Sequence, residues 1–198
     1  MRRLAALALI LLLASCTNPI VQADVTRFND MPVAQTHSFT IVPDAGQVAS
    51  LEFQGYATQI ATALTAQGWR PIPPGGTAET SVALHWGVGP PDTVSWQSPS
   101  SVYSGFGWGG GPRYYGGGLY DPFPYWESRS ITYYPKWLAV QITDARSGIR
   151  KVLFEGRAVA EGTRREIAPV MPYLVQALFT GFPGANGATV RVNVPIRE

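Results

Sequence analysis

The sequence predicts an α+β fold in two layers, with a mainly antiparallel sheet and two helices on one face of it. Three observations support this prediction: segments in which apolar and polar residues alternate, two segments with apolar residues at helical spacing, and turn residues between neighbouring alternating segments. Taken along the chain, the segments give the order β-α-β-β-β-α-β. The predicted domain covers residues 24–198, a size that buries a core without disulfides or metals.

The domain is expected to begin with a strand and a helix. His37, Phe39 and Ile41 alternate with polar residues, which is typical of a half-buried strand. An amphipathic helix follows, because apolar residues recur at helical spacing before Gly68, which favours a helix end. The apolar stripe of this helix consists of Phe53, Tyr56, Ala57, Ile60 and Leu64.

Three strands are expected in the middle of the chain. Strict alternation over residues 81–88 predicts a strand that stops at the Gly-Pro-Pro of residues 89–91. A longer strand contains residues 134–142, and the turn residues at 144–148 lead to a return strand at 152–160. Because a short turn joins the last two strands, we expect them to pair antiparallel.

A second helix and a closing strand complete the predicted domain. Pro169 and Pro172 fit a helix only before or within its first turn, and Gly181 followed by Pro183 is typical of a helix end. Alternating valines at residues 190–194 predict the last strand. The apolar positions of the helix are Ile167, Val170, Met171, Leu174 and Leu178.

A long connection at about residues 89–128 is rich in glycine and aromatic residues and nearly uncharged. Connections of this length are usually functional or disordered. Its aromatic rings could stack on sugar rings, since Tyr and Trp combine an apolar face with a polar tip. The alternative is that these rings only cover exposed sheet surface. The candidate stacking residues are Trp108, Tyr114, Tyr115, Tyr120 and Trp126.

No motif in the sequence indicates an enzyme, a metal centre or a cofactor. The two histidines, His37 and His85, lie on predicted strands and lack the spacing of metal ligands. A P-loop and a GxSxG elbow are both missing. Asp92, Asp121 and Glu127 flank the long connection and could form a carboxylate pair of a hydrolase, but flexible chain does not hold the geometry that catalysis needs. We therefore expect a non-catalytic protein.

The N-terminus has the order of a secretory leader. Arg2 and Arg3 are followed by an apolar run of about 11 residues, which is shorter than the roughly 20 that span a bilayer. These two arginines also account for the formal net charge of +2, because the remaining 13 basic residues balance 13 acidic ones. A neutral domain does not favour nucleic acid as a partner, because that binding needs clustered basic charge.

The segment Leu13-Ala14-Ser15-Cys16, which contains the only cysteine, resembles the lipobox of bacterial lipoproteins. The resemblance implies that the cysteine sulfur accepts a diacylglyceryl group, that cleavage occurs between Ser15 and Cys16, and that fatty acids such as palmitate form the anchor. Residues 1–15 would then be the lipoprotein signal peptide and residues 16–23 a lipidated tether. Thr17 in place of aspartate implies sorting to the outer membrane, facing the periplasm.

Two longer stretches resemble a family of such lipoproteins. These are YYPKWLAVQITDARSG at residues 133–148 and VMPYLVQALFTGFPGANGATVRV at residues 170–192, which are similar to the proteins grouped under domain of unknown function 4136. The resemblance implies a lipoprotein with an α+β domain and adds no catalytic residue or cofactor. The expected role is a lipid-anchored, non-catalytic interaction or structural module of the bacterial cell envelope. Its expected partners are the membrane, through the anchor, and another envelope protein.

Two other roles remain open. The first is glycan binding, to peptidoglycan or a surface polysaccharide, through the aromatic residues of the long connection. The second is hydrolysis of an envelope substrate by the acidic residues that flank that connection.

Overall fold

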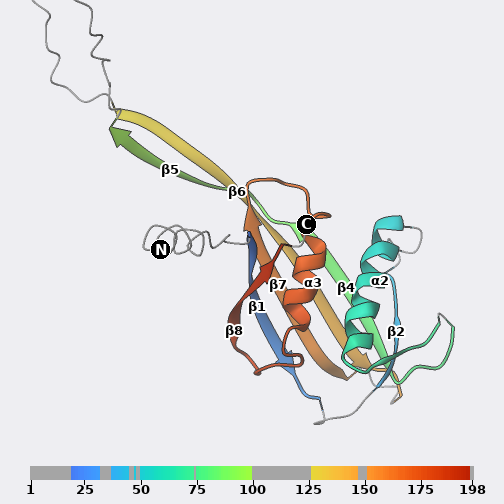
Figure 1. Ribbon diagram of the computed structural model, residues 1–198. Helices are drawn as coiled ribbons and strands as arrows, with labels where there is room; N and C mark the ends of the chain where they lie inside the picture. The colour runs from blue at the N-terminus through green and yellow to red at the C-terminus, as the bar shows by residue number, and fades with distance from the viewer. Residues whose placement is uncertain are drawn as a thin grey trace, which may run out of the picture.

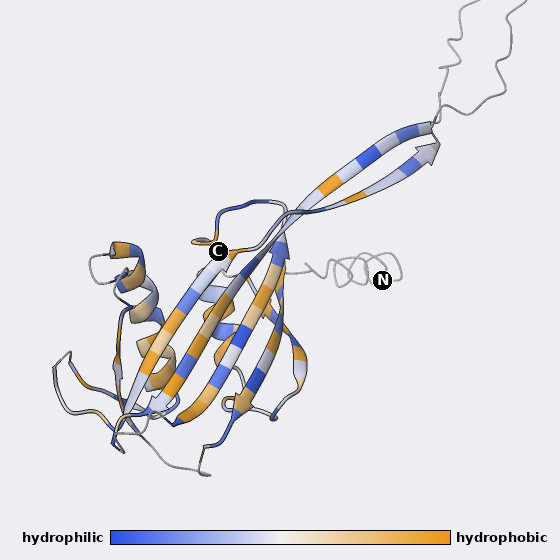
Figure 2. Ribbon diagram, turned by 180° about the vertical axis from the view of Figure 1, so that it is seen from behind, coloured by the Kyte–Doolittle hydropathy of each residue, from blue (hydrophilic) through white to orange (hydrophobic). Residues whose placement is uncertain are grey.

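The computed structural model describes residues 19–31, 37–44, 47, 50–73, 75–99, 126–146 and 151–196. Within them the chain forms a mixed α+β structure with one large, mostly antiparallel sheet and two helices, as the sequence predicts. Figure 1 shows both helices against the same face of the sheet. Figure 2 shows the opposite face, where hydrophilic and hydrophobic residues alternate along the strands.

The sheet joins strands that are distant in the sequence. Its order is β3-β2-β4-β6-β7-β1-β8, and β5 pairs with β6 outside this path. Only the short β2 is parallel to its neighbours β3 and β4. The strands are β1 (Ile20–Asn29), β2 (Ser38–Ile41), β3 (Arg70–Pro71), β4 (Thr80–Val88), β5 (Asp92–Pro99), β6 (Trp126–Asp144), β7 (Val152–Gly162) and β8 (Thr189–Pro195).

Three strands were not predicted, so the predicted order β-α-β-β-β-α-β is incomplete. β1, β3 and β5 are the additional strands. Residues 20–23, predicted as tether, are the start of β1, which lies between β7 and β8. Residues 92–99 and 126–128, predicted as part of the long connection, are paired strand. Residues 21–26 and 93–97 do alternate, but the first segment overlaps the predicted tether and the second lies in the predicted long connection, and the two-residue β3 is too short to show a period.

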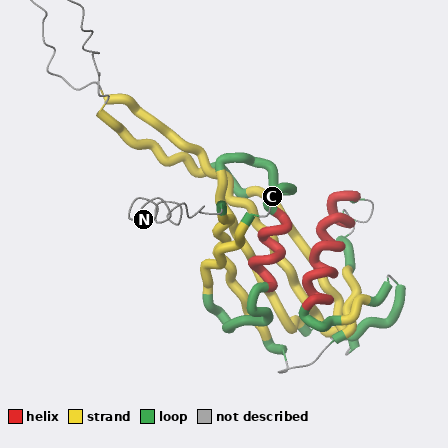
Figure 3. The backbone as a smooth tube through the Cα atoms, viewed as in Figure 1, coloured by secondary structure: helices red, strands yellow, loops and turns green. Residues whose placement is uncertain are grey.

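The helices follow the predicted stripes. α2 (Leu51–Ala66) begins after Ser50, whose side chain accepts a hydrogen bond from the backbone N–H of Phe53 at 3.2 Å. α3 (Met171–Phe179) begins two residues after Pro169 and has Pro172 in its first turn, where the missing N–H is harmless. Figure 3 shows the two helices side by side, and both pack on the sheet to enclose one apolar core. Its largest fully buried side chains include Phe39, Ile60, Leu64, Leu84, Leu138, Ile142, Phe154, Met171, Leu174 and Leu178.

A buried arginine joins β1 to the end of α3. Arg27 is 5% exposed, and its Nε donates a hydrogen bond to the carbonyl oxygen of Leu178 at 3.0 Å. Its Nη2 donates to the carbonyl oxygens of Ala177 at 2.9 Å and Thr180 at 2.8 Å. Carbonyls at a helix C-terminus lack partners within the helix and carry partial negative charge. Arg27 therefore acts as the C-terminal cap of α3, although burial lowers its pKa.

Candidate functional site

A two-stranded arm projects from the body of the molecule (Figure 1). It consists of β5 and the first part of β6, which pair antiparallel from Asp92 opposite Tyr133 to Pro99 opposite Trp126. Eight residues of strand extend for about 25 Å. The remainder of β6 continues into the main sheet between β4 and β7, so the arm is a direct extension of that sheet.

The two faces of the arm differ in chemistry. Val94 lies opposite Ile131, and Trp96 is next along the same face, opposite Arg129. The exposed fractions of Val94, Trp96 and Ile131 are 49%, 42% and 36%. The other face is lined mainly by hydroxyl side chains, of which Thr93 and Thr132 are hydrogen-bonded at 3.0 Å. The arm thus presents an apolar face, here called the Val94–Trp96–Ile131 face, and a polar one.

Among the described residues, the arm has no third strand beside it. In the part of the chain that the structure describes, β5 pairs only with β6, and residues 126–133 pair only with β5. A lone two-stranded ribbon is marginally stable in water, because it buries little apolar surface. Open strand edges with few charges are also templates for pairing with another chain. Both features are typical of a surface that a partner covers.

Of the five predicted stacking residues, the structure places one. Trp126 is the first residue of β6, at the far end of the arm, and is 61% exposed. Trp108, Tyr114, Tyr115 and Tyr120 lie outside the described residues. Trp96 was not predicted as a site residue, although residues 93–97 alternate as in a strand within the long connection.

The acidic residues of the arm do not form a catalytic pair. Asp92 lies opposite Tyr133, six residues along β6 from Glu127, which places the two carboxylates about 20 Å apart along the strand. A glycosidase pair needs roughly 5–10 Å. Glu127 instead accepts a hydrogen bond from the Arg129 guanidinium at 3.3 Å. The third acid, Asp121, lies outside the described residues.

The two histidines lie in separate surroundings. His37 is 3% exposed, with Nδ1 3.2 Å from Glu79 Oε2 and its ring edge-on to Trp69 at 5.1 Å. His85 is on the helix-free face, with Nδ1 3.4 Å from Asp44 Oδ2. Within the described residues no group of three or more His, Cys, Asp or Glu could hold a metal ion. Hydrogen bonds from Ser38 N–H and His37 hold the pKa of Glu79 below its ordinary value, as expected for a structural contact.

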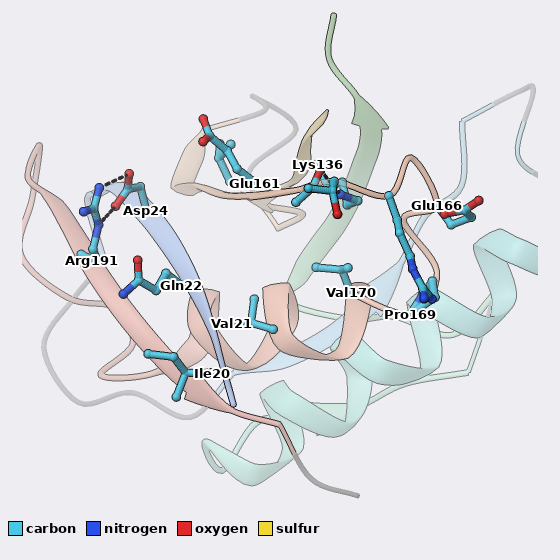
Figure 4. Close-up of a pocket in the computed structure, with 14 residues that line it drawn as sticks. Ile20, Val21, Gln22, Asp24, Lys136, Glu161, Glu166, Pro169, Val170 and Arg191 are labelled. Carbon is cyan, nitrogen blue, oxygen red and sulfur yellow. Dashed lines mark hydrogen bonds and ion pairs between the residues drawn. The ribbon is translucent and has the colours of Figure 1, made fainter. Parts of the chain in front are cut away.

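A cavity of about 740 Å³ lies at the end of the sheet from which the arm extends (Figure 4). The start of β1 forms one wall, and the segment between β7 and α3 forms another. Arg191 and Asp24 at its rim form a bidentate ion pair at 2.8 and 2.9 Å. Other lining residues include Val21, Lys136, Glu161, Thr163, Arg164 and Glu166.

Lys136, which lines this cavity, is a charged residue that is almost completely buried. It occupies an inward-facing position of β6 and is 2% exposed. Its Nζ donates hydrogen bonds to the carbonyl oxygens of Tyr134 at 3.2 Å and Gly162 at 3.5 Å. Burial lowers the pKa of Lys136, and the charge of Glu166 acts in the opposite direction. The sequence placed this lysine among the apolar positions of its strand, and only the fold shows that it lines a cavity.

The predicted lipid attachment site, Cys16, and its cleavage flank, Ser15, lie outside the described residues. The described chain begins close to them, at Pro19, and β1 starts at Ile20. Among the described residues, neither helix has the length and apolar character needed to cross a membrane.

Comparison with known proteins identifies one family. The family described as "Domain of unknown function (DUF4136)" matches residues 23–184. Comparison with curated proteins gives no match. Among solved structures, a PDZ domain protein from Parabacteroides distasonis is similar at a TM-score of 0.48 and 13% sequence identity. That alignment covers 96% of this chain and 42% of the other, so this chain spans less than half the length of that protein.

Proposed function

The chain belongs to the DUF4136 family, and from this premise we propose that it is a lipid-anchored bacterial cell-envelope protein that docks an envelope protein partner through its β5–β6 arm. The anchor is Cys16, and the location is the outer membrane, facing the periplasm. The observation that carries the proposal is the Val94–Trp96–Ile131 face, which is exposed on a ribbon whose outer edges pair with no other described strand. The partner would add a strand to an edge of the arm, with its apolar side chains on this face.

A non-catalytic role agrees with the described side chains. The two described acids of the arm are too far apart to cooperate, and the described histidines are each held by one carboxylate. Binding by strand addition needs neither a nucleophile nor a metal, because backbone hydrogen bonds supply affinity and side chains supply selectivity.

The anchor is tested by metabolic labelling. Cells that express the full chain should incorporate a labelled fatty acid into it, and Cys16→Ser should remove the label, because only a thiol forms the thioether. Ser15→Ala, which keeps a small residue before the cysteine, is the matched control and should remain labelled. A labelled Cys16→Ser protein would contradict the anchor.

The arm is tested by cross-linking in intact cells. A photoreactive amino acid at Trp96 should give one discrete adduct with an envelope protein, whereas the same group at Gln54, exposed on α2, should not. The double variant Val94→Ser and Ile131→Ser should abolish the adduct from position 96. Its free energy of unfolding should stay within about 0.5 kcal/mol of wild type, because both residues lie on the surface and outside the core. Equal adducts from positions 54 and 96 would contradict docking at the arm.

Glycan binding is a second candidate, favoured by the exposed rings of Trp96 and Trp126, which lie on opposite faces of the same arm. It predicts that the full chain sediments with insoluble peptidoglycan and that Trp96→Ser with Trp126→Ser reduces the bound fraction at least fivefold. The Val94→Ser and Ile131→Ser variant separates the two functions, because it keeps both rings and should still sediment if glycan is the ligand.

A further inference from the structure

The outer edge of β5 is the more suitable of the arm's two edges for pairing with another strand. Between Thr93 and Ser98 it carries no charged side chain, whereas residues 126–133 of β6, which form the other edge, include Glu127 and Arg129. Charged side chains on an edge strand oppose pairing, so the β5 edge is the more open to it. Figure 2 shows the arm projecting beyond the body of the molecule, and among the described residues no strand pairs with this edge.

The sequence of β5 is complementary to itself when two copies run antiparallel. Directly opposite residues of an antiparallel pair share one face of the sheet, so a two-fold axis between identical strands lies at the level of a residue and not between two residues. With the axis at Ser95, Val94 of each copy lies opposite Trp96 of the other. Aromatic and β-branched side chains in directly opposite positions stabilise a pair of strands.

This register also gives suitable neighbours to the polar residues of β5. Thr93 lies opposite Gln97 of the second copy, and Ser95 lies opposite Ser95, all on the polar face of the arm. Asp92 is the only charged residue of β5, and it lies opposite Ser98 of the second copy. The register therefore brings no like charges together.

The neighbouring symmetric registers are less favourable. An axis at Trp96 places Val94 opposite Ser98 and includes Pro99, which has no N–H to donate. An axis at Val94 pairs fewer residues and places Asp92 opposite Trp96. The axis at Ser95 pairs all of residues 92–98 and joins the apolar residues of both copies.

We propose that the partner docked by the arm is a second copy of this chain, with β5 of the two copies paired antiparallel about a two-fold axis at Ser95. The inference rests on the proposed function, since it identifies the partner for which the arm is the docking surface. The paired arms would form one four-stranded sheet in the order β6-β5-β5-β6. The Val94–Trp96–Ile131 faces of the two copies would then be continuous, and such a sheet is more stable than two separate ribbons.

Disulfide formation tests the register. The full chain, with one cysteine introduced into β5, is purified in a non-ionic detergent and oxidised with diamide. Ser95→Cys should give a covalent dimer, because the two thiols lie directly opposite each other. Thr93→Cys and Gln97→Cys should each give at least tenfold less dimer alone, since identical positions are then about 14 Å apart along the strands. A mixture of these two variants should cross-link. The parent chain, whose only cysteine is Cys16, reports any dimer that does not depend on β5.

A charge at the axis tests the same contact without a new cysteine. Ser95→Lys places two ammonium groups opposite each other and should lower the dimer fraction in native mass spectrometry at least tenfold. Ser130→Lys is the matched control, because Ser130 lies opposite Ser95 on β6 and its charge stays one strand away from the axis. This control should remain dimeric. Thermal melting confirms that both variants are folded.

The photo-cross-link from position 96 separates this inference from the proposed function. An adduct with twice the mass of the chain supports both. An adduct with a different protein, without a dimer from Ser95→Cys, would overturn the second copy as partner and leave docking at the arm intact. Absence of both the adduct and the dimer would overturn both. Equal dimer formation by Thr93→Cys and Ser95→Cys would overturn the axis at Ser95, and so would a folded Ser95→Lys variant with the dimer fraction of wild type.

Discussion

Arg27 and Lys136 are two buried cations on the helix-covered face of the sheet, but their surroundings differ. Their exposed fractions are 5% and 2%, and burial lowers the pKa of each. Arg27 donates three hydrogen bonds of 2.8–3.0 Å to the C-terminal end of α3. Lys136 donates two longer ones to separate backbone carbonyls and lines a cavity.

The difference separates a charge that caps a helix from a charge held by two unrelated carbonyls. The carbonyls of a helix C-terminus need donors and carry partial negative charge, so Arg27 and α3 stabilise each other. Lys136 is held by two backbone carbonyls, and the charge of Glu166 offsets only part of the effect of burial on its pKa. Three substitutions test this comparison.

The largest effect is expected for Arg27→Met. The change leaves the carbonyls of Ala177, Leu178 and Thr180 without this donor, and a buried unsatisfied group costs about 1–3 kcal/mol. We expect the free energy of unfolding to fall by about 3 kcal/mol in urea denaturation. Arg70→Met, at an exposed arginine, should change it by less than about 0.5 kcal/mol. Equal losses in the two variants would show that Arg27 does not cap α3.

An intermediate effect is expected for Gly184→Ala. Gly184 has a φ of +82°, and an added Cβ would lie 2.8 Å from Arg27 Nη1. Gly181→Ala is the control, because Gly181 has a φ of +69° and open space around it. Backbone strain alone should destabilise both by about 1 kcal/mol, and displacement of Arg27 should add about 1 kcal/mol at Gly184. Identical melting temperatures of the two variants would show that Arg27 can move away from the added methyl group without loss of stability.

The smallest effect is expected for Lys136→Met. Replacing a buried ammonium, whose burial the charge of Glu166 offsets only in part, by an apolar side chain should change the free energy of unfolding by less than about 1 kcal/mol. The lowered pKa also predicts a pH dependence. Because the unfolded state binds the proton more tightly, wild type should gain stability relative to the variant as the pH rises through the folded-state pKa towards about 10.5. A large loss of stability, as for Arg27→Met, would make Lys136 a structural residue.

Local patterns predicted much of this fold correctly. Four of the five residues in the predicted stripe of α2 are buried, and the strand at residues 81–88 ends before Gly89, as expected. Both helices pack against one face of a mostly antiparallel sheet. The arm was not predicted for two reasons. The many glycines and prolines near residues 93–97 favoured a loop over a strand. In addition, β5 pairs with β6 across the intervening residues 100–125, and a local pattern does not show such a pairing.

Little of the candidate site could be predicted. Trp126 was named for its chemistry, but its place at the end of a paired arm depends on strand pairing. Lys136 was visible only as a charged residue at an apolar strand position. Its cavity is formed by β1, β6, β7 and the segment before α3, which come together only in the folded chain. The lipid attachment at Cys16 remains a prediction from its sequence context alone.

The sequence by itself determined which segments have the period of a strand or a helix, where turns interrupt them, and that the acidic and basic residues outside the leader balance. These properties are local or additive, so they can be read without knowing the neighbours. Only the tertiary structure decided that β1 lies between β7 and β8, that Arg27 caps α3 and that Lys136 lines a cavity. Each of these depends on contacts between residues far apart in the chain, whose pairing is selected by the packing of the whole domain.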